Sequence, residues 1–234
     1  MSQLTNIPAG EQLKKQTNLF YLCIPLYILV PILFVFVFYR FGQPFHLGAF
    51  AIGILGWVIA LFLRGPIALV AHHFLSEKKA STLVVLSSGP LEEIVRFIVL
   101  AITVSTFSYS LSIGQGWAAI EVLYAIVSGF MTLQVLRGTD EKAQQAKEIL
   151  EKQGMNMNIN PLLGVWERIF ASGFHIGATL LIAHSTWLLF ILIPLHSLLN
   201  LSVVYLMKRS MAYAQILVTA VGTLALLAGW LIWG

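Results

Sequence analysis

The chain has 234 residues, of which 58% are hydrophobic and only 10% are charged, against about 25% charged residues in typical soluble domains. A soluble core cannot hide this much apolar surface, because a chain of this size still exposes a large area to water. The composition excludes an ordinary soluble domain, a disordered chain and a small disulfide-rich scaffold, and it predicts an integral membrane protein. The net charge of +4 does not indicate a nucleic-acid partner, since the cations lie between apolar blocks.

Seven apolar runs are long enough for a bilayer crossing, which needs about 20 mostly apolar residues. In chain order they cover 18–39, 47–63, 81–109, 117–136, 161–183, 186–207 and 211–233. The polar segment 1–17 precedes the first run, which we expect to stay in the protein as a span because it exceeds the length of a signal-peptide core. The predicted fold class is an all-α bundle of seven transmembrane helices that forms one domain over residues 1–234.

The cations predict how these spans face. With the N-terminus inside, eleven Lys and Arg residues fall in inner segments and one, Arg40, falls outside. Arg64 counts among the inner residues, directly after the second span. This positive-inside bias predicts a cytoplasmic N-terminus and an outer C-terminus, in what we expect to be a bacterial cytoplasmic membrane.

Two segments depart from simple spans. The inner loop 138–160 is polar, and good helix formers between 140 and 153 predict a solvated or interfacial helix within it. The third run, 81–109, is too long for one straight crossing. Gly89-Pro90 lies inside it and predicts a break or kink, because proline disturbs a helix interior.

Ionisable residues inside spans are costly, and they usually face a bundle interior or a wet cavity. The predicted spans contain eight of them and a nearby asparagine: Glu92, Glu93, Arg96, Glu121, Glu167, Arg168, His175, His196 and Asn200. At a rise of about 1.5 Å per residue, Glu92 and His175 lie about 20 Å from the inner side and His196 about 15 Å from the outer side. We expect these three side chains at comparable depth, with Glu121 nearer the outer surface.

Simpler interpretations exist for each of these residues. If the membrane began at Pro90, Glu92 and Glu93 would lie in a first helical turn at the interface, where the helix dipole stabilises carboxylates. A single buried histidine such as His175 is often only hydrogen-bonded. The spacing of His196 and Asn200, four residues apart, also arises easily by chance.

A cluster of two histidines and two carboxylates at mid-membrane suits water activation or metal binding. The only aspartate is Asp140, in a predicted loop, so a paired-aspartate protease has no residues to use. The sequence contains neither H-E-x-x-H nor G-x-S-x-G, which are signatures of zinc and serine hydrolases. The remaining candidate is a site in which glutamate and histidine side chains act together.

The motifs around these residues resemble a known group of membrane enzymes. Leu91-Glu92-Glu93-Ile94-Val95-Arg96 is followed by Glu167-Arg168 with His175, and then by His196-Ser-Leu-Leu-Asn200. This order resembles the CAAX-protease and bacteriocin-processing superfamily of intramembrane proteases. Within it, the chain is most similar to the YhfC-like branch of intramembrane metalloproteases, whose glycine-rich segment ending in glutamate corresponds to Gly114–Glu121.

The resemblance implies an intramembrane endopeptidase that acts on a membrane protein or a lipidated peptide. Its catalytic residues would be Glu92, Glu93, Arg96, His175, His196 and Asn200, supported by Glu121, Glu167 and Arg168. In the hypothesis that follows, Glu92 is the general base on a water, and Arg96 orients the carboxylates. His175 positions the water or protonates the leaving amine, and His196 and Asn200 donate to the oxyanion.

A zinc-dependent version would use the same side chains, with Glu92, His175 and His196 as ligands. We favour the version without a cofactor, although the sequence alone does not separate the two. A non-catalytic membrane scaffold of the same fold and a proton-coupled transporter remain alternatives, because buried carboxylates and histidines also serve those roles.

Overall fold

The computed structural model describes residues 9–104, 106–152 and 160–233, and this part of the chain is entirely helical. In order, its helices are α1 (Ala9–Arg40), α2 (Leu47–Phe74), α3 (Glu77–Ala101), α4 (Phe107–Arg137), α5 (Glu141–Lys152), α6 (Pro161–His184), the short 3-10 turn η1 (Thr186–Leu188), α7 (Leu189–Met207) and α8 (Met211–Leu231). The all-α prediction is confirmed.

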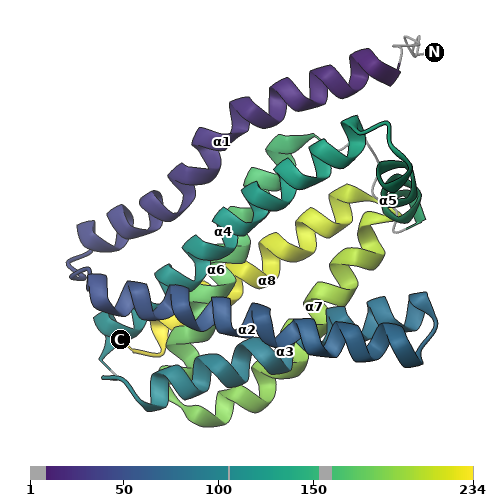
Figure 1. Ribbon diagram of the computed structural model, residues 1–234. Helices are drawn as coiled ribbons and strands as arrows, with labels where there is room; N and C mark the ends of the chain where they lie inside the picture. The colour runs from purple at the N-terminus through teal and green to yellow at the C-terminus, as the bar shows by residue number, and fades with distance from the viewer. Residues whose placement is uncertain (1–8, 105, 153–159, 234) are drawn as a thin grey trace.

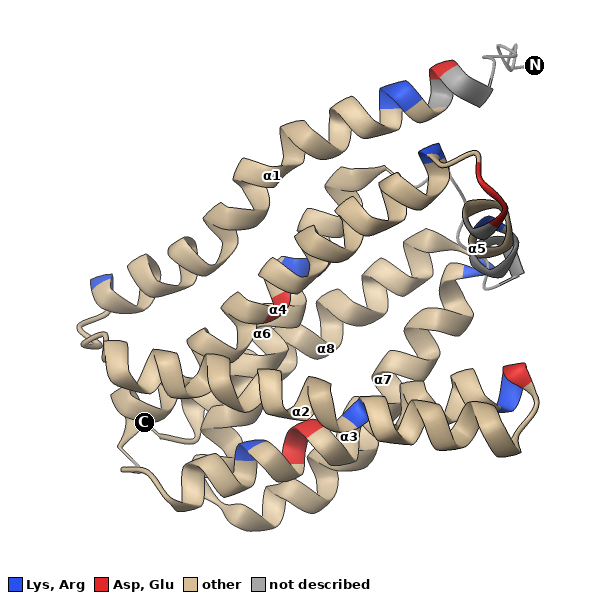
Figure 2. Cartoon of the chain, in the orientation of Figure 1, with Lys and Arg blue, Asp and Glu red and all other residues tan. Residues whose placement is uncertain are grey.

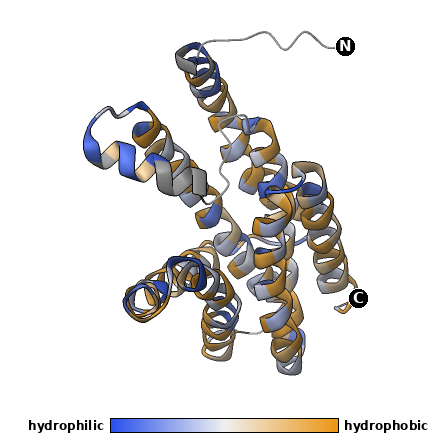
Figure 3. Ribbon diagram, turned by 90° about the vertical axis from the view of Figure 1, so that its right-hand side faces the viewer, coloured by the Kyte–Doolittle hydropathy of each residue, from blue (hydrophilic) through white to orange (hydrophobic). Residues whose placement is uncertain are grey.

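Among the described residues, five helical stretches are long and apolar enough to cross a membrane: Leu13–Arg40, Leu47–Phe74, Phe107–Arg137, Thr186–Met207 and Met211–Leu231. Helices α3 and α6, with 25 and 24 residues, are as long as some of these five stretches. They differ from them in containing most of the ionisable residues of the predicted spans. Hydrophobic residues dominate the long helices in Figure 3, whereas α5 is mostly hydrophilic. These features indicate an integral membrane protein.

The long helices form two groups that cross each other. α1, α4, α6 and α8 run alongside one another, while α2 and α3 form a pair that crosses them (Figure 1). The most extensive packing joins α6 to α8 and α2 to both α3 and α4. In Figure 2 the charged residues gather at helix ends, with a few in the interior where these groups meet. The candidate site lies at this meeting point.

The predicted third span, 81–109, has the wrong bounds. Helix α3 ends at Ala101 and α4 begins at Phe107. The predicted span therefore combined three parts: most of α3, the connection after it and the first turn of α4. Hydropathy does not mark this connection clearly, because residues 102–106 contain Ile102 and Val104 and no charged residue. The fourth span, predicted to begin at residue 117, therefore begins about three helical turns earlier.

Of the break or kink predicted at Gly89-Pro90, the break does not occur, since α3 is continuous through these residues. Pro90 has no N–H and leaves the carbonyl of Leu86, four residues earlier, without its helical donor. The hydroxyl of Ser197 on α7 donates to that carbonyl at 2.8 Å. Gly89 permits the approach, because a Cβ there would collide with α7. A neighbouring helix thus supplies the hydrogen bond that proline removes.

The polar segment 138–160 contains the predicted helix, α5, within the expected range. Asp140 precedes it, and its carboxylate accepts from the backbone N–H of Ala143 at 2.7 Å, which is a standard helix N-cap. The rest of the predicted loop, at 153–159, lies outside the described residues. Helix α6 then begins at Pro161 behind a second cap, the Asn160 side chain, which accepts from the N–H of Leu162 at 3.0 Å.

Small residues bring α6 and α8 into close contact. A Cβ on Gly177 would collide with the backbone at Ala225, and a Cβ on Gly222 would collide with the backbone at Phe170. Glycine is common at such interfaces because it lets two membrane helices approach closely. This packing fixes the face of α6 on which His175 lies.

Candidate active site

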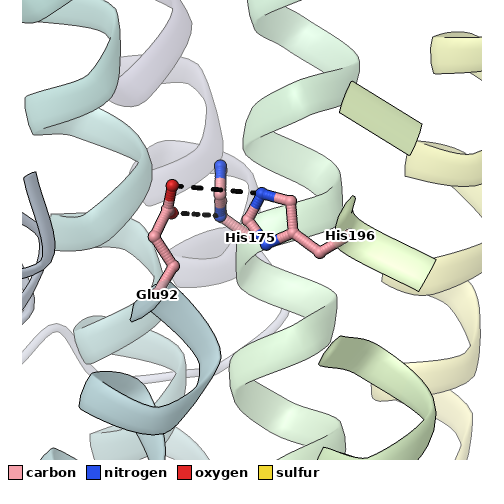
Figure 4. Close-up of side chains that lie close together, drawn as sticks. All are labelled: Glu92, His175 and His196. Atoms are coloured by element: carbon pink, nitrogen blue, oxygen red, sulfur yellow. Dashed lines mark ion pairs between the residues drawn. The ribbon is translucent and has the colours of Figure 1, made fainter. Parts of the chain in front are cut away.

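Three buried side chains from three helices converge in the interior. Glu92 comes from α3, His175 from α6 and His196 from α7, and they point toward one another in Figure 4. One potential ligand atom from each lies within 4.8 Å of the other two. Each residue is only 3% exposed. The three side chains therefore lie at the same level of the helix bundle. Glu92 and Glu93 are not in a first helical turn, because α3 begins at Glu77.

His196 is held by the second glutamate of the pair. Its Nδ1–H donates to Glu93 Oε1 at 2.7 Å, because a carboxylate can only accept. The other ring nitrogen, Nε2, faces Glu92 Oε1 across 4.0 Å. Two hydrogen bonds of about 2.8 Å to one water can span such a separation. His196 therefore presents a free nitrogen beside Glu92.

Both ring nitrogens of His175 are engaged. Arg96 Nη2 donates to Nδ1 at 2.9 Å, and because arginine has no acceptor, Nδ1 must be the unprotonated nitrogen. Nε2 contacts a carboxylate oxygen of Glu121, so it carries the proton. The ring is fixed as one neutral tautomer, with Nδ1 3.9 Å from Glu92 Oε2.

Arg96 connects α3 to α6 and is itself completely buried. Its Nε lies 3.1 Å from Glu93 Oε2. Its Nη1 donates to the carbonyl of His175 at 2.6 Å and to Thr179 Oγ1 at 2.9 Å. The guanidinium also stacks 4.4 Å from the Trp117 ring centroid. The carboxylate that Arg96 orients is thus that of Glu93. Arg96 also determines where His175 lies.

The supporting residues predicted from sequence form a chain behind His175. Glu121 accepts from Arg168 Nη1 at 2.6 Å, and Arg168 Nη2 donates to Glu167. These three side chains are 15–25% exposed. Glu121 lies deeper than expected because α4 begins at Phe107, so fourteen residues separate it from the start of its helix.

Asn200 takes a different position from the other predicted residues. Its amide nitrogen donates to Ser88 Oγ at 2.7 Å, which adds a third hydrogen bond between α7 and α3, after those of His196 and Ser197. Ser88 in turn donates to the carbonyl of Val85 at 2.7 Å. The geometry thus gives Asn200 a link between helices, one turn away from His196.

Two residues in contact with Glu92 were not among the predicted site residues. Trp117 Nε1–H donates to Glu92 Oε2 at 3.1 Å, and Arg64 Nη2 donates to Glu92 Oε1. The interpretation of Arg64 as an inner-loop cation is wrong, because α2 continues to Phe74. The signal was present in the sequence: Ile67-Ala-Leu-Val70 follows Arg64, so the apolar run extends on both sides of it.

The donor set shares one feature with known zinc sites and differs in two others. The carboxylate behind each histidine matches the outer shell that zinc-binding histidines usually have. However, ligand atoms around tetrahedral zinc lie about 3.4 Å apart at bond lengths of about 2.1 Å, and here Glu92 is 3.9 and 4.0 Å from the two imidazoles. Arg64 and Arg96 also donate to two of the three ligand atoms, so a zinc ion would have to displace two cations. The three side chains are close enough together to hold a metal ion, but their present hydrogen bonds favour the version without one.

Comparisons with models of known protein families, with curated proteins and with solved structures find no match. The chemistry of the site therefore rests on its own residues: a buried carboxylate beside a free imidazole nitrogen, held by residues from α2, α3, α4, α6 and α7.

Proposed function

We propose that the protein is an intramembrane endopeptidase of the glutamate type. The observation that carries the proposal is the buried convergence of Glu92, His175 and His196 from three helices, with a carboxylate behind each imidazole. Buried ionisable groups in membrane proteins are rarely retained without a functional role. Their arrangement suits the activation of one water molecule.

In the proposed reaction, a water bridges Glu92 and His196 Nε2. Glu92 takes a proton from the water as its oxygen bonds to the peptide carbonyl carbon, and the carbonyl π pair moves to the carbonyl oxygen. When the tetrahedral intermediate collapses, the C–N bond breaks and the leaving nitrogen takes the proton from Glu92. His196 orients the water, and Glu93 holds the ring in place. His175 acts as a positioning residue, because both its nitrogens are already bonded.

The membrane topology belongs to the same proposal. We place α3 and α6 across the bilayer with the five apolar stretches, giving seven crossings with a cytoplasmic N-terminus. The distribution of Lys and Arg supports this orientation. The resemblance of the Glu-Glu-x-x-Arg and His-x-x-x-Asn motifs to the YhfC-like family supports the reaction class and a membrane protein or lipidated peptide as substrate.

A peptide library tests the proposal. Purified protein in liposomes is incubated with apolar peptides from a tryptic digest of bacterial membrane proteins, and new termini are identified by mass spectrometry. We expect wild type to cleave a subset, and His196→Ala to lower the rate on the best-cleaved peptide by about 10²–10³-fold, since acid–base and water-orienting groups contribute on this scale.

His73→Ala is the matched control, because that histidine is exposed near the end of α2. Its rate should equal that of wild type. Absence of new termini with wild type would overturn the peptidase and favour a scaffold or a transporter. Equal rates for His196→Ala and wild type would overturn the mechanism.

The reaction is expected to need no zinc. Elemental analysis of the purified protein should find well under one zinc per chain, and a strong chelator should leave cleavage unchanged, because Arg64 and Arg96 already occupy the ligand atoms. One zinc per chain that disappears in His175→Ala would contradict this prediction.

A further inference from the structure

Arg64 is the most accessible side chain in contact with Glu92. Its side chain is 24% exposed, whereas that of Glu92 is 4% exposed. Trp117, which holds the other carboxylate oxygen, is fully buried. Arg64 thus extends from the buried carboxylate toward the outside of the bundle.

One N–H donor of the Arg64 guanidinium has no acceptor among the described residues. Its Nη2 donates to Glu92, but its Nε is buried and has no hydrogen-bond partner among the described residues. A buried donor without a partner is rare and costs about 1–3 kcal/mol. Arginine presents its N–H groups in a planar fork that suits an oxygen anion. The free Nε–H therefore points to an acceptor that the resting protein does not provide.

Proton transfer supplies that acceptor during the proposed reaction. When Glu92 takes the proton from water, its negative charge disappears, and an equal charge appears on the carbonyl oxygen of the substrate a few ångströms away. A guanidinium that pairs with Glu92 at rest can then pair with the new anion. Preorganised donors that meet charge only as it develops are among the strongest sources of catalysis.

We infer that Arg64 is a catalytic residue that stabilises the tetrahedral oxyanion, moving its charge-assisted hydrogen bonds from Glu92 to the substrate oxygen. This inference rests on the proposed function. It assigns the stabilisation of the oxyanion to Arg64 on α2, whereas the sequence motif predicted this role for His196 and Asn200. The amide of Asn200 is bonded to Ser88, and Nε2 of His196 faces Glu92. Arg64 differs in that it contacts Glu92 and has an Nε–H with no partner among the described residues.

The test compares Arg64→Met with Arg64→Lys on the best-cleaved library peptide. We expect Arg64→Met to lower kcat by about 10²–10³-fold, as loss of an oxyanion donor does in other hydrolases, with KM within about threefold. A phosphonate analogue of the same peptide carries a tetrahedral anion, and it should bind Arg64→Met weaker by a similar factor. Arg64→Lys keeps the charge and should recover part of both.

Arg40→Met is the matched control, because it removes an arginine at the exposed end of α1. Its phosphonate affinity should stay within about threefold of wild type. A kcat for Arg64→Met close to wild type overturns the inference. So does a lower kcat with unchanged phosphonate binding, which would leave Arg64 only holding Glu92. In both cases wild type still cleaves the peptide, so the proposed function stands; failure of wild type to cleave removes both.

Discussion

Replacement of Glu92 by glutamine is expected to lower kcat by about 10³-fold or more, the upper part of the range for loss of a general base. Glutamine has nearly the same shape, so the helices should remain in place, although its single amide oxygen can replace only one of the two carboxylate oxygens that accept from Trp117 and Arg64. It cannot take a proton from water. The measurement is the rate of cleavage of the best library peptide in liposomes, with KM determined in parallel.

The control for this prediction is Glu77→Gln, which removes a carboxylate from the same helix at its exposed first turn. Its kcat should equal that of wild type. If Glu92→Gln retains more than about a tenth of the wild-type rate, Glu92 is not the base. Glu93 and Glu121 would then be the remaining candidates for the general base.

The largest effect on stability is expected for Arg96→Met. The side chain is fully buried. It forms an ion pair with Glu93 and donates hydrogen bonds to the imidazole and carbonyl of His175 and to Thr179. Methionine leaves the Glu93 carboxylate buried without its cation, and breaking a buried ion pair in this way costs about 3–5 kcal/mol. The free energy of unfolding in mixed detergent micelles should fall by this amount.

Arg209→Met provides the comparison, because that guanidinium stacks on the Tyr205 ring at 4.5 Å in an exposed turn. Such a contact contributes about 0.5–1 kcal/mol. Adding Glu93→Gln to Arg96→Met should restore at least about 1 kcal/mol, since coupled neighbours are not additive. If Arg96→Met is no more destabilising than Arg209→Met, the buried network does not hold the helices together.

Much of the fold could be predicted from the sequence, because lipid imposes simple rules on length and apolar content. The positions of α1, α7 and α8 follow directly from them. The rules failed where an apolar segment was not a helix, as at Ile102 and Val104. They failed again where a charge lay inside a helix, as at Arg64, which ended the second predicted span eleven residues before α2 does.

The centre of the site was predictable for a different reason. Glu92, His175 and His196 stand out because they are costly in lipid, and helix geometry alone put them at comparable depth. Their individual bonds were not predictable, since these depend on the rotation of each helix about its axis. The motif therefore paired His196 with Asn200, whereas the structure pairs it with Glu93 and leaves Asn200 with Ser88.

The hydrogen bond from Ser197 to the Leu86 carbonyl has a consequence for the alignment of α3 and α7. Pro90 creates a vacant acceptor at one point along α3, and only one hydroxyl on α7 fills it. A shift of α7 by one residue in either direction would lose that bond. Ser197 directly follows His196, and Pro90 lies two residues before Glu92. The proline therefore helps to fix the axial register of α7 relative to α3, and this register places the His196 imidazole opposite Glu92 and Glu93.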